Sequence, residues 1–325
     1  MNPALILTPT PEALDRAARA LTAGKLVAFP TETVYGVGVD ASNQEATDRL
    51  YTLKGRPRDN PLIVHVASLS MAREVALFND AARTLAYQFW PGPLTMILPL
   101  AKGSFDVRPA CAGMDTVAIR LPGHPLAQDL IMRAGVPIAA PSANLSGRLS
   151  ATTPQAVVQD LAVDLVLADG ASPIGLESTI LDPQAWPPRL LRPGSIGPGV
   201  LAEVLGVPPV IVENAQAPGH FGRHYAPQTP LRLDVREPKP REALLTFGPS
   251  LADGNHVRHL SASGDLAQAA ANLYRLLREL DGLGRKRIAI MPIPHEGIGL
   301  AINDRLARAA KSTDKREGKG KDEGQ

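Results

Sequence analysis

Apolar residues in the first part of the chain follow two spacings, one typical of helices and one typical of strands. Between Pro11 and Ala23 they recur on one helical face, and the apolar run 25–30 that follows is typical of a buried strand. Both patterns recur as far as Ile196, without a strict repeat. They predict strands at 61–68, 94–100, 116–122, 137–143, 165–170 and 178–182, and helices at 42–54, 81–90, 124–135 and 153–162. Such a mixture predicts an α/β domain built on a mixed sheet.

A chain of 325 residues is long enough for two domains. The composition changes after the first domain, which indicates where it ends. Segment 206–230 is rich in proline and too long for a routine connection, so we expect an interdomain linker. Strand patterns at 242–248 and 287–294 and helix patterns at 264–284 and 300–310 predict a small second α/β domain. The last residues have few apolar side chains to bury. We expect a first domain at 1–200, a linker at 201–230, a second domain at 231–311 and a disordered tail at 312–325.

The charge balance argues against a broad surface for nucleic acids. Lysine and arginine number 34 against 32 aspartate and glutamate, a formal net charge of +2. This balance allows a local basic pocket but does not indicate a general polyanion-binding surface. Aromatic residues make up only 4% of the chain, so a base-stacking platform of the kind used by single-strand binders is not evident.

Cysteine usage and apolar runs bear on the compartment. Cys111 is the single cysteine of the chain, which excludes an internal disulfide and suits a reducing compartment. No activating base stands beside it, so we expect a buried or incidental thiol. The N-terminal stretch lacks the pattern of a secretory signal, and no apolar run approaches the ~18 residues of a membrane span. We therefore expect a soluble cytoplasmic protein with no membrane contact.

A basic run between prolines follows the helix predicted at 42–54. Asn43 or the serine before it could cap that helix, and Lys54 followed by glycine is ordinary helix-ending chemistry. Arg56 and Arg58 need another explanation, because a plain connection does not require guanidinium groups held between prolines. Solvated loop charges are the alternative interpretation.

Several familiar motifs are absent or weak. The stretch 36–41, GVGVDA, formally matches the dinucleotide fingerprint, but polar residues separate it from the preceding strand, where the fingerprint requires the first glycine to follow the strand directly. The sequence contains no Walker A loop, no G-x-S-x-G elbow and no H-E-x-x-H pair. A metal held by a protein cage is therefore not expected.

Small, polar and cationic residues gather at the ends of five predicted strands. They occur in FPTETVYG, KGRPRDNP, DTVAIRLPGHP, APSANLSGRLSATT and LESTILD, the last followed by LLRPGSI. Planar guanidinium groups suit phosphate and carboxylate, and small residues let backbone N–H groups approach phosphate oxygens. Each hydroxyl alone would more often be a cap or turn residue. Together the segments favour a site for an anionic ligand.

These motifs identify a resemblance. PTETVYG, KGRP…NPL, WPGPLT, AIRLPGHP, PSANLSG and STILD…LLRPG resemble the threonylcarbamoyl-adenylate synthase family, whose catalytic domain is YrdC-like. The second half, from HYAPQTP to GLAINDRLARAA, is similar to the extra C-terminal domain of the longer, two-domain branch. The fold implied is a YrdC-like mixed twisted sheet with a positively charged concave site, followed by a smaller Rossmann-like α/β domain.

The resemblance implies a reaction. L-threonine, bicarbonate or CO2, and ATP give threonylcarbamoyl-adenylate and pyrophosphate, with Mg2+ on the ATP phosphates and no protein ligand to the metal. Other proteins later transfer the activated group to an adenosine beside the anticodon of certain tRNAs. Whether tRNA itself makes a weak direct contact stays open. Alignment and charge neutralisation matter more in such a step than a protein acid or base.

Site residues follow by resemblance, each at the position that matches the motif. ATP would be held by Lys54, Arg56, Asn60, Thr116, Ser142, Ser150, Arg192 and Tyr225. L-threonine would be held by Thr33, His65, Arg120, the carbonyl of Ala140, and Ser178, with Arg120 pairing the carboxylate. No residue is expected to act as acid or base, since Lys54 and Arg56 would position ATP. The segment around Tyr225, with Arg223 and His224, would form a lid that keeps water from the product.

Two other interpretations compete with this one. A module that binds structured RNA without chemistry would also need a basic concavity, although the charge balance and the scattered hydroxyl-bearing motifs argue against it. An enzyme that uses carbamoyl phosphate would need a further acyl-transfer domain and metal ligands that the sequence does not contain. ATP consumption that depends on both threonine and bicarbonate would separate the synthase from the RNA-binding module.

Overall fold

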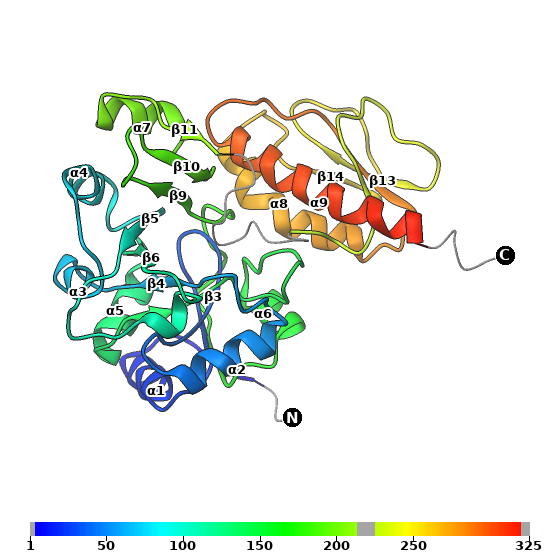
Figure 1. Ribbon diagram of the computed structural model, residues 1–325. Coiled ribbons are helices and arrows are strands. Elements are labelled where there is room, and N and C mark those ends of the chain that lie inside the picture. Colours follow the sequence, from blue (N-terminus) through cyan, green and yellow to red (C-terminus); the bar gives the residue numbers. More distant parts are fainter. Residues whose placement is uncertain (1–3, 213–224, 320–325) are drawn as a thin grey trace.

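The protein forms two α/β units that pack against one another. The structure, a computed structural model, describes residues 4–212 and 225–319, with side chains as far as residue 311. In the described residues an 11-stranded sheet belongs to the first unit and a 4-stranded sheet to the second. Figure 1 shows the second unit against one side of the first, with its helices α8 (Leu266–Asp281) and α9 (Gly299–Lys319) running side by side.

The first sheet is mixed, as the sequence predicts. Its order is β1-β8-β2-β3-β7-β4-β6-β5-β9-β10-β11, with parallel pairs such as β4 with β6 and antiparallel pairs such as β5 with β6. The strands are β1 (Leu5–Leu7), β2 (Val27–Phe29), β3 (Gly36–Asp40), β4 (Ile63–His65), β5 (Leu94–Pro99), β6 (Thr116–Arg120), β7 (Ile138–Ala139), β8 (Leu165–Leu167), β9 (Thr179–Asp182), β10 (Arg189–Arg192) and β11 (Val210–Ile211).

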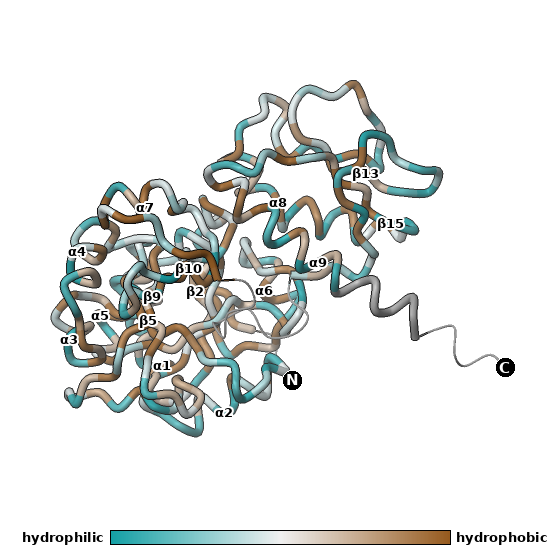
Figure 2. The backbone as a smooth tube through the Cα atoms, turned by 45° about the horizontal axis from the view of Figure 1, so that its top comes forward, coloured by the Kyte–Doolittle hydropathy of each residue, from teal (hydrophilic) through white to brown (hydrophobic). Residues whose placement is uncertain are grey.

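Helices cover this sheet and bury their apolar faces against it. They are α1 (Pro11–Thr22), α2 (Gln44–Lys54), α3 (Leu69–Val75), α4 (Asp80–Phe89), α5 (Pro125–Ala134), α6 (Pro154–Asp160) and α7 (Pro198–Leu205), with a short 3-10 turn at Arg108–Ala110. Helix α1 packs against α5, and their buried residues form one core cluster with Phe29 and Leu167. Figure 2 shows hydrophobic segments gathered around the strands of this unit and mainly hydrophilic loops at its edge.

Helix α2 ends where the sequence predicts, and its ends use local chemistry. Asn43 caps the start, because its side chain accepts from the backbone N–H of Ala46 at 2.9 Å, a contact typically worth about 1 kcal/mol. Gly55 follows Lys54 with φ 59°, the left-handed conformation that glycine adopts without a steric penalty. The chain therefore leaves the helix abruptly and enters the basic run at Arg56.

Strand β3 explains why GVGVDA is not a nucleotide fingerprint. It pairs antiparallel with β2, so the two strands form a hairpin across residues 30–35 and no helix begins at its glycines. A Cβ at Gly38 would lie 2.7 Å from Ile138 Cγ2 and 2.7 Å from Phe29 Cε1. Side-chain packing thus requires glycine at this position, independently of any phosphate.

The second unit is the small α/β domain that the sequence predicts. Its strands are β12 (Leu231–Arg232), β13 (Glu242–Thr246), β14 (Val257–His259) and β15 (Arg287–Ile290), all parallel, in the order β12-β15-β13-β14. Helices α8 and α9 pack their apolar residues into its core. The Rossmann-like description of this unit stays a prediction.

Two expected boundaries are wrong in part. Segment 201–230 does not act as a linker throughout, because α7 buries Leu201 and β11 pairs with β10, which leaves residues up to 212 in the first unit. Helix α9 continues to Lys319, past the expected start of the disordered tail at 312. Extending a helix costs less than starting one, so a helix whose earlier turns are packed can continue past them. Residues 213–224 and 320–325 lie outside the described part.

The two units share one hydrophobic core cluster. Val34, Leu149 and Leu176 of the first unit are buried in one cluster with the apolar residues of α8 and α9. Arg278 of α8 pairs with Asp160 at 2.6 Å and donates to the carbonyl of Leu149. The docking of the second unit is therefore built from both apolar burial and specific polar contacts.

Candidate functional site

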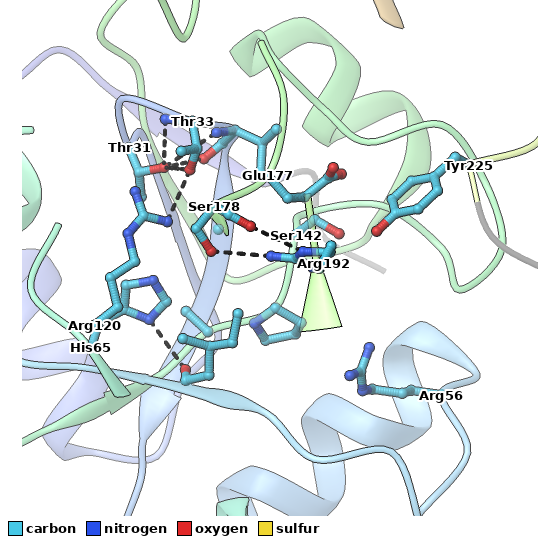
Figure 3. A pocket seen from close by; sticks show the side chains of 15 residues that line it. Thr31, Thr33, Arg56, His65, Arg120, Ser142, Glu177, Ser178, Arg192 and Tyr225 are labelled. Carbon is cyan, nitrogen blue, oxygen red and sulfur yellow. Dashed lines mark hydrogen bonds between the residues drawn. The ribbon is translucent and has the colours of Figure 1, made fainter. Parts of the chain in front are cut away.

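One pocket gathers most of the predicted site residues. It lies where the turn after β2, the basic run after α2, the segment after β7 and the approach to β9 meet, beside the segment that enters the second unit. Figure 3 shows Arg120, His65, Thr31 and Thr33 at one end, and Tyr225 and Arg56 at the other. Its lining residues are Thr31, Thr33, Val34, Gly36, Arg56, Ile63, His65, Arg120, Ala140, Pro141, Ser142, Glu177, Ser178, Arg192 and Tyr225.

Two threonines and an arginine build the first end of the pocket. Thr31 Oγ1 lies 2.8 Å from Thr33 Oγ1 and donates to the carbonyl of Val34 at 2.6 Å, which holds the turn after β2. Arg120, at the end of β6, donates from Nη1 to Thr33 Oγ1 at 2.9 Å and from Nη2 to Glu32 at 2.5 Å. This end therefore offers hydroxyl groups next to a fixed guanidinium.

His65 closes the same end and is neutral. It lies on β4, is 3% exposed, and its Nδ1 is 3.1 Å from the carbonyl of Ile63, to which it donates as the protonated nitrogen. Burial lowers the pKa of His65 to about 3, and the neighbouring charge of Arg120 acts in the same direction. A neutral imidazole can bond a substrate without adding charge.

Ser178 and Arg192 lie between the two ends. Arg192, at the end of β10, donates from Nε to the Ser178 carbonyl at 3.0 Å and from Nη2 to Ser178 Oγ at 3.1 Å. Ser178 Oγ is also 2.7 Å from Thr95 Oγ1 on β5. Both residues are buried, so strand packing holds the guanidinium and the hydroxyl in place.

The basic run supplies Arg56 to the second end. Arg56 is half-buried and donates from Nε to the carbonyl of Asn60 at 3.0 Å, and from Nη2 to Asn60 Oδ1 at 2.5 Å and the carbonyl of Pro61 at 2.7 Å. These acceptors are neutral, so they orient the positive charge of Arg56 without cancelling it. Such a group favours an anion in the pocket.

Four of the predicted residues do not line the pocket: Lys54, Asn60, Thr116 and Ser150. Lys54 Nζ donates to the backbone carbonyls of Ser142 and Asn144, and burial, with the charge of Arg56, sets its pKa well below the usual value. Asn60 orients Arg56. Ser150 Oγ donates to Glu177 at 2.5 Å, and Thr116 begins β6. All but Thr116 contact a residue that does line the pocket.

Two polar lining residues are not among the predicted ones. Thr31 orients Thr33, and Glu177 brings a carboxylate into a pocket otherwise rich in cations and hydroxyls. Burial opposes the charge of Glu177, but Arg305 and Arg192 outweigh it, so its pKa is lowered. Both residues lie inside the motifs PTETVYG and LESTILD, so their polar character beside the predicted site residues is the signal that indicates them.

Possible metal ligands and the thiol of Cys111 are two further features of the described part of the chain. Within the described residues, no group of three or more histidine, cysteine, aspartate or glutamate side chains could hold a metal ion. Cys111 is buried, and burial raises the pKa of its thiol to about 12. Across the same part of the chain, no helix has the length and apolar character to cross a bilayer.

The fold and the pocket define a two-domain α/β protein with a buried pocket lined by hydroxyl and guanidinium groups. The family model described as "Telomere recombination" (Sua5_yciO_yrdC) matches residues 19–194, and that described as "Threonylcarbamoyl-AMP synthase, C-terminal domain" matches residues 199–311. The chain belongs to the two-domain threonylcarbamoyl-AMP synthase family.

Individual relatives agree with this assignment along nearly the whole chain. The threonylcarbamoyl-AMP synthase of Pyrococcus abyssi is 39% identical over 90% of this chain and 93% of its own, and that of Bacillus subtilis is 39% identical over 91% and 92%. The crystal structure of P. abyssi Sua5 complexed with L-threonine superposes with a TM-score of 0.86, at 35% identity, and the match covers 96% of this chain and 98% of that one.

Proposed function

We propose that this protein is an L-threonylcarbamoyladenylate synthase, which converts L-threonine, bicarbonate or CO2, and ATP into threonylcarbamoyl-AMP and pyrophosphate. One observation carries the proposal: a single pocket has hydroxyls and Arg120 at one end, and Arg56, Arg192 and Tyr225 towards the other. The first end suits a small hydroxylated amino acid, and the second suits a nucleotide. The relatives named threonylcarbamoyl-AMP synthase and the relative crystallised with L-threonine support it.

The reaction needs alignment and charge neutralisation. The amine of threonine forms a carbamate with CO2 and releases a proton. A carbamate oxygen then bonds to the α-phosphorus of ATP while the bond to the bridging oxygen breaks, and pyrophosphate leaves. Arg56 and Arg192 are suited to offset the charge that develops on the phosphates, an effect worth several kcal/mol in comparable sites. No acid or base among the lining residues is required.

The threonine end is assigned to Thr33, His65, Arg120, the Ala140 carbonyl and Ser178, with Arg120 on the carboxylate. A guanidinium suits a carboxylate because its parallel N–H groups match the two oxygens. Neutral His65 and the hydroxyls of Thr33 and Ser178 are then available for the amine and the side-chain hydroxyl.

The nucleotide end is assigned to Lys54, Arg56, Asn60, Thr116, Ser142, Ser150, Arg192 and Tyr225. Lys54 is bonded to the carbonyls of Ser142 and Asn144, so direct contact with phosphate requires it to exchange them for phosphate oxygens. In its present position it fixes the Ser142 segment beside Arg56. With Lys54 in either position, the basic run contributes to binding the triphosphate of ATP.

Magnesium belongs to the proposal as a partner of ATP. The pocket offers hydroxyl oxygens, while its carboxylate, Glu177, already accepts from Ser150, Tyr274 and Arg305. This donor set fits a metal whose ligands are mostly phosphate oxygens and water, with hydroxyls such as that of Ser142 nearby. Bound there, the ion would lower the negative charge of the phosphates.

The wider setting is proposed from the family. A cytoplasmic protein would pass threonylcarbamoyl-AMP to the proteins that modify tRNA, and a weak direct contact with tRNA stays an open alternative. The described residues up to 212 would form the catalytic domain and 231–311 the second domain. The segment before Tyr225 would act as a lid, although Arg223 and His224 lie outside the described residues.

A mass spectrum tests the function. Purified protein with ATP, bicarbonate and L-threonine should give the mass of threonylcarbamoyl-AMP and one pyrophosphate per product. Leaving out either threonine or bicarbonate should abolish both products. Tight RNA binding with no ATP consumption would instead support the RNA-binding module.

A further inference from the structure

Two side chains of the second domain contact the carboxylate of Glu177, a residue that lines the pocket. Glu177 lies just before β9 in the first domain, lines the pocket and is 6% exposed. It accepts from the Tyr274 hydroxyl at 3.1 Å to each oxygen and from Arg305 Nε at 2.9 Å. Tyr274 belongs to α8 and Arg305 to α9, so these bonds form only when the two domains are docked.

The same two side chains of the second domain hold Tyr225. The ring of Tyr225 stacks on that of Tyr274, with centroids 6.1 Å apart and planes at 24°, and the guanidinium carbon of Arg305 lies 5.1 Å from the Tyr225 centroid. Tyr225 lines the pocket, so residues of the second domain hold a side chain that belongs to the site.

The backbone at Tyr225 also needs this support. Its φ is 60°, in the left-handed region that non-glycine residues adopt only when neighbouring contacts hold them there. The next residue, Ala226, donates its N–H to the carbonyl of Gly147 at 3.0 Å, beside the predicted ATP-binding segment. Contacts from both domains therefore fix one conformation of this residue.

The buried charges in this cluster indicate that it fixes one geometry between the domains rather than adding to the stability of their contact. Arg305 is 1% exposed, and besides Glu177 it donates to Asp304 at 2.7 Å. Removing two charges from water is expensive, and well-packed apolar residues often stabilise an interface as well or better. In this cluster another arrangement would leave Glu177 or Arg305 buried and unpaired, so the ion pair holds a single geometry.

We propose that Glu177, Tyr274 and Arg305 are positioning residues of the synthase site, through which the second domain holds Tyr225 at the nucleotide end of the pocket. Glu177 also orients Ser150, so its contacts join the second domain to two of the predicted ATP-binding residues. The inference rests on the proposed function and extends it, because the second domain then contributes to nucleotide binding.

Steady-state kinetics of the full-length chain supply the first test. In the Arg305→Ala variant we expect the KM for ATP to rise at least about tenfold and the KM for threonine to change by less than about threefold, because Tyr225 lies at the nucleotide end. Arg275→Ala is the matched control: this arginine lies on α8, is exposed and pairs with Glu279, and its loss should leave both constants unchanged. Equal KM values for ATP in wild type and a folded Arg305→Ala variant would overturn the proposal.

Conservative variants separate positioning from simple support of the fold. Tyr274→Phe keeps the ring beneath Tyr225 and loses only the hydroxyl on Glu177, so it should raise the KM for ATP less than Tyr274→Ala. In a double-mutant cycle, Arg305→Ala should add little to Tyr225→Ala, because both remove the same contribution. Fully additive effects would show that Arg305 does not act through Tyr225, and the proposal would be wrong.

Hydrogen exchange tests the cluster without relying on activity. In ligand-free protein, peptides covering residues 225–230 should exchange faster in Arg305→Ala and Glu177→Gln than in wild type or Arg275→Ala. If wild-type protein neither binds ATP nor makes the product, the proposed function fails and with it the kinetic role, while exchange still reports on the cluster. If wild type is active but exchange and KM are unchanged in both variants, only the positioning proposal fails.

Discussion

The guanidinium of Arg120 is bonded to the carboxylate of Glu32, with Nη2 2.5 Å from Oε1, although both side chains are largely buried. Burial opposes the charge of Glu32, but Arg120 overcomes it and the pKa of Glu32 is lowered. Thr33 Oγ1 and the Gly92 carbonyl each accept another N–H group of Arg120. A guanidinium carries more N–H groups than these contacts use, so it can also donate to a second carboxylate. Arg120 is thus held in place for a second carboxylate, which we assign to threonine.

Replacing Arg120 tests this assignment. Arg120→Lys keeps the charge but loses the planar pair of donors, so the KM for threonine should rise at least about tenfold. The KM for ATP should change by less than about threefold. Initial rates at varied threonine and fixed saturating ATP measure the effect. If the KM for ATP rose instead, Arg120 would belong to the nucleotide end.

Arg56 and Arg58 form a matched pair for testing the basic run. Arg56 lines the pocket, whereas Arg58 is exposed, pairs with Asp48 and lies over the ring of Tyr51. Arg56→Ala should lower kcat/KM for ATP at least ~10²-fold, because a cation at a phosphoryl site contributes several kcal/mol to the transition state. Arg58→Ala should stay within about threefold of wild type. Similar losses in both variants would indicate a general effect of loop charge.

The pH dependence of stability should report on His65. Its folded-state pKa of about 3 is below the usual value, so as pH falls below about 6.5 the unfolded chain binds a proton that the folded protein excludes. The free energy of unfolding should therefore fall by up to about 1.4 kcal/mol per pH unit, or about 1.7 kcal/mol between pH 6.5 and 5.

The variant His65→Gln isolates this effect. His124 also has a pKa lowered by burial and contributes in the same direction, but it is present in both proteins. Glu32 and Glu177, with lowered pKa values, lose their contribution only at more acidic pH. Urea unfolding at several pH values above 5 should give a shallower slope for the variant, and equal slopes would mean that His65 is not the source.

The sequence predicted the elements with local causes, and missed those fixed by distant contacts. The ends of α2 are predictable because Asn43 caps its first turn and Gly55 ends it in a left-handed conformation. Strands β4, β5 and β6 are predictable from their apolar runs. Strand β3 alternates glycine with valine and has no regular polar face, because both of its faces are buried. The position of β8 between β1 and β2 depends on pairing between residues such as Leu5 and Leu165, which no local pattern encodes.

The site residues also separate into those that local motifs predict and those that depend on distant contacts. The arginines and hydroxyls of the pocket lie in motifs that could be read along the chain. Glu177 was not predicted because a carboxylate does not fit an anion site recognised by its cations and hydroxyls, and its partner Arg305 is 128 positions away. The sequence also could not reveal that Lys54 points to backbone carbonyls, since side-chain direction depends on how the Ser142 segment folds against α2.

Amino-acid choice follows from the hydroxyl groups at the threonine end. A site that hydrogen-bonds a substrate hydroxyl leaves buried polar groups unpaired when valine binds, so kcat/KM for valine should be at least ~10²-fold below that for threonine. Serine lacks only a methyl group and should lose about 1–3 kcal/mol. Competition between the amino acids, read by mass spectrometry of the products, measures both ratios. Comparable kcat/KM for valine and threonine would contradict the assignment.

The last prediction concerns Tyr225 as a cover for the product. The pocket that Tyr225 lines has a volume of about 60 Å³, enough for a few water molecules, so we expect this side chain or its neighbours to move when ATP and threonine bind. Threonylcarbamoyl-AMP is a mixed anhydride that water destroys, and a site that closes again over it protects it. Tyr225→Ala should leave the protein folded, because the residue lies outside the helices and strands, and remove most of the synthase activity.

The ratio of products distinguishes a cover from a simple binding contact. If Tyr225 only bound ATP, the variant would consume less ATP but give the same yield of threonylcarbamoyl-AMP for each ATP consumed. If it also excludes water, Tyr225→Ala should release a larger share of free AMP, because the anhydride is hydrolysed before it leaves. Tyr225→Phe keeps the ring that stacks on Tyr274 and should protect the product nearly as well as wild type. An unchanged share of AMP in Tyr225→Ala would reduce the residue to a nucleotide contact.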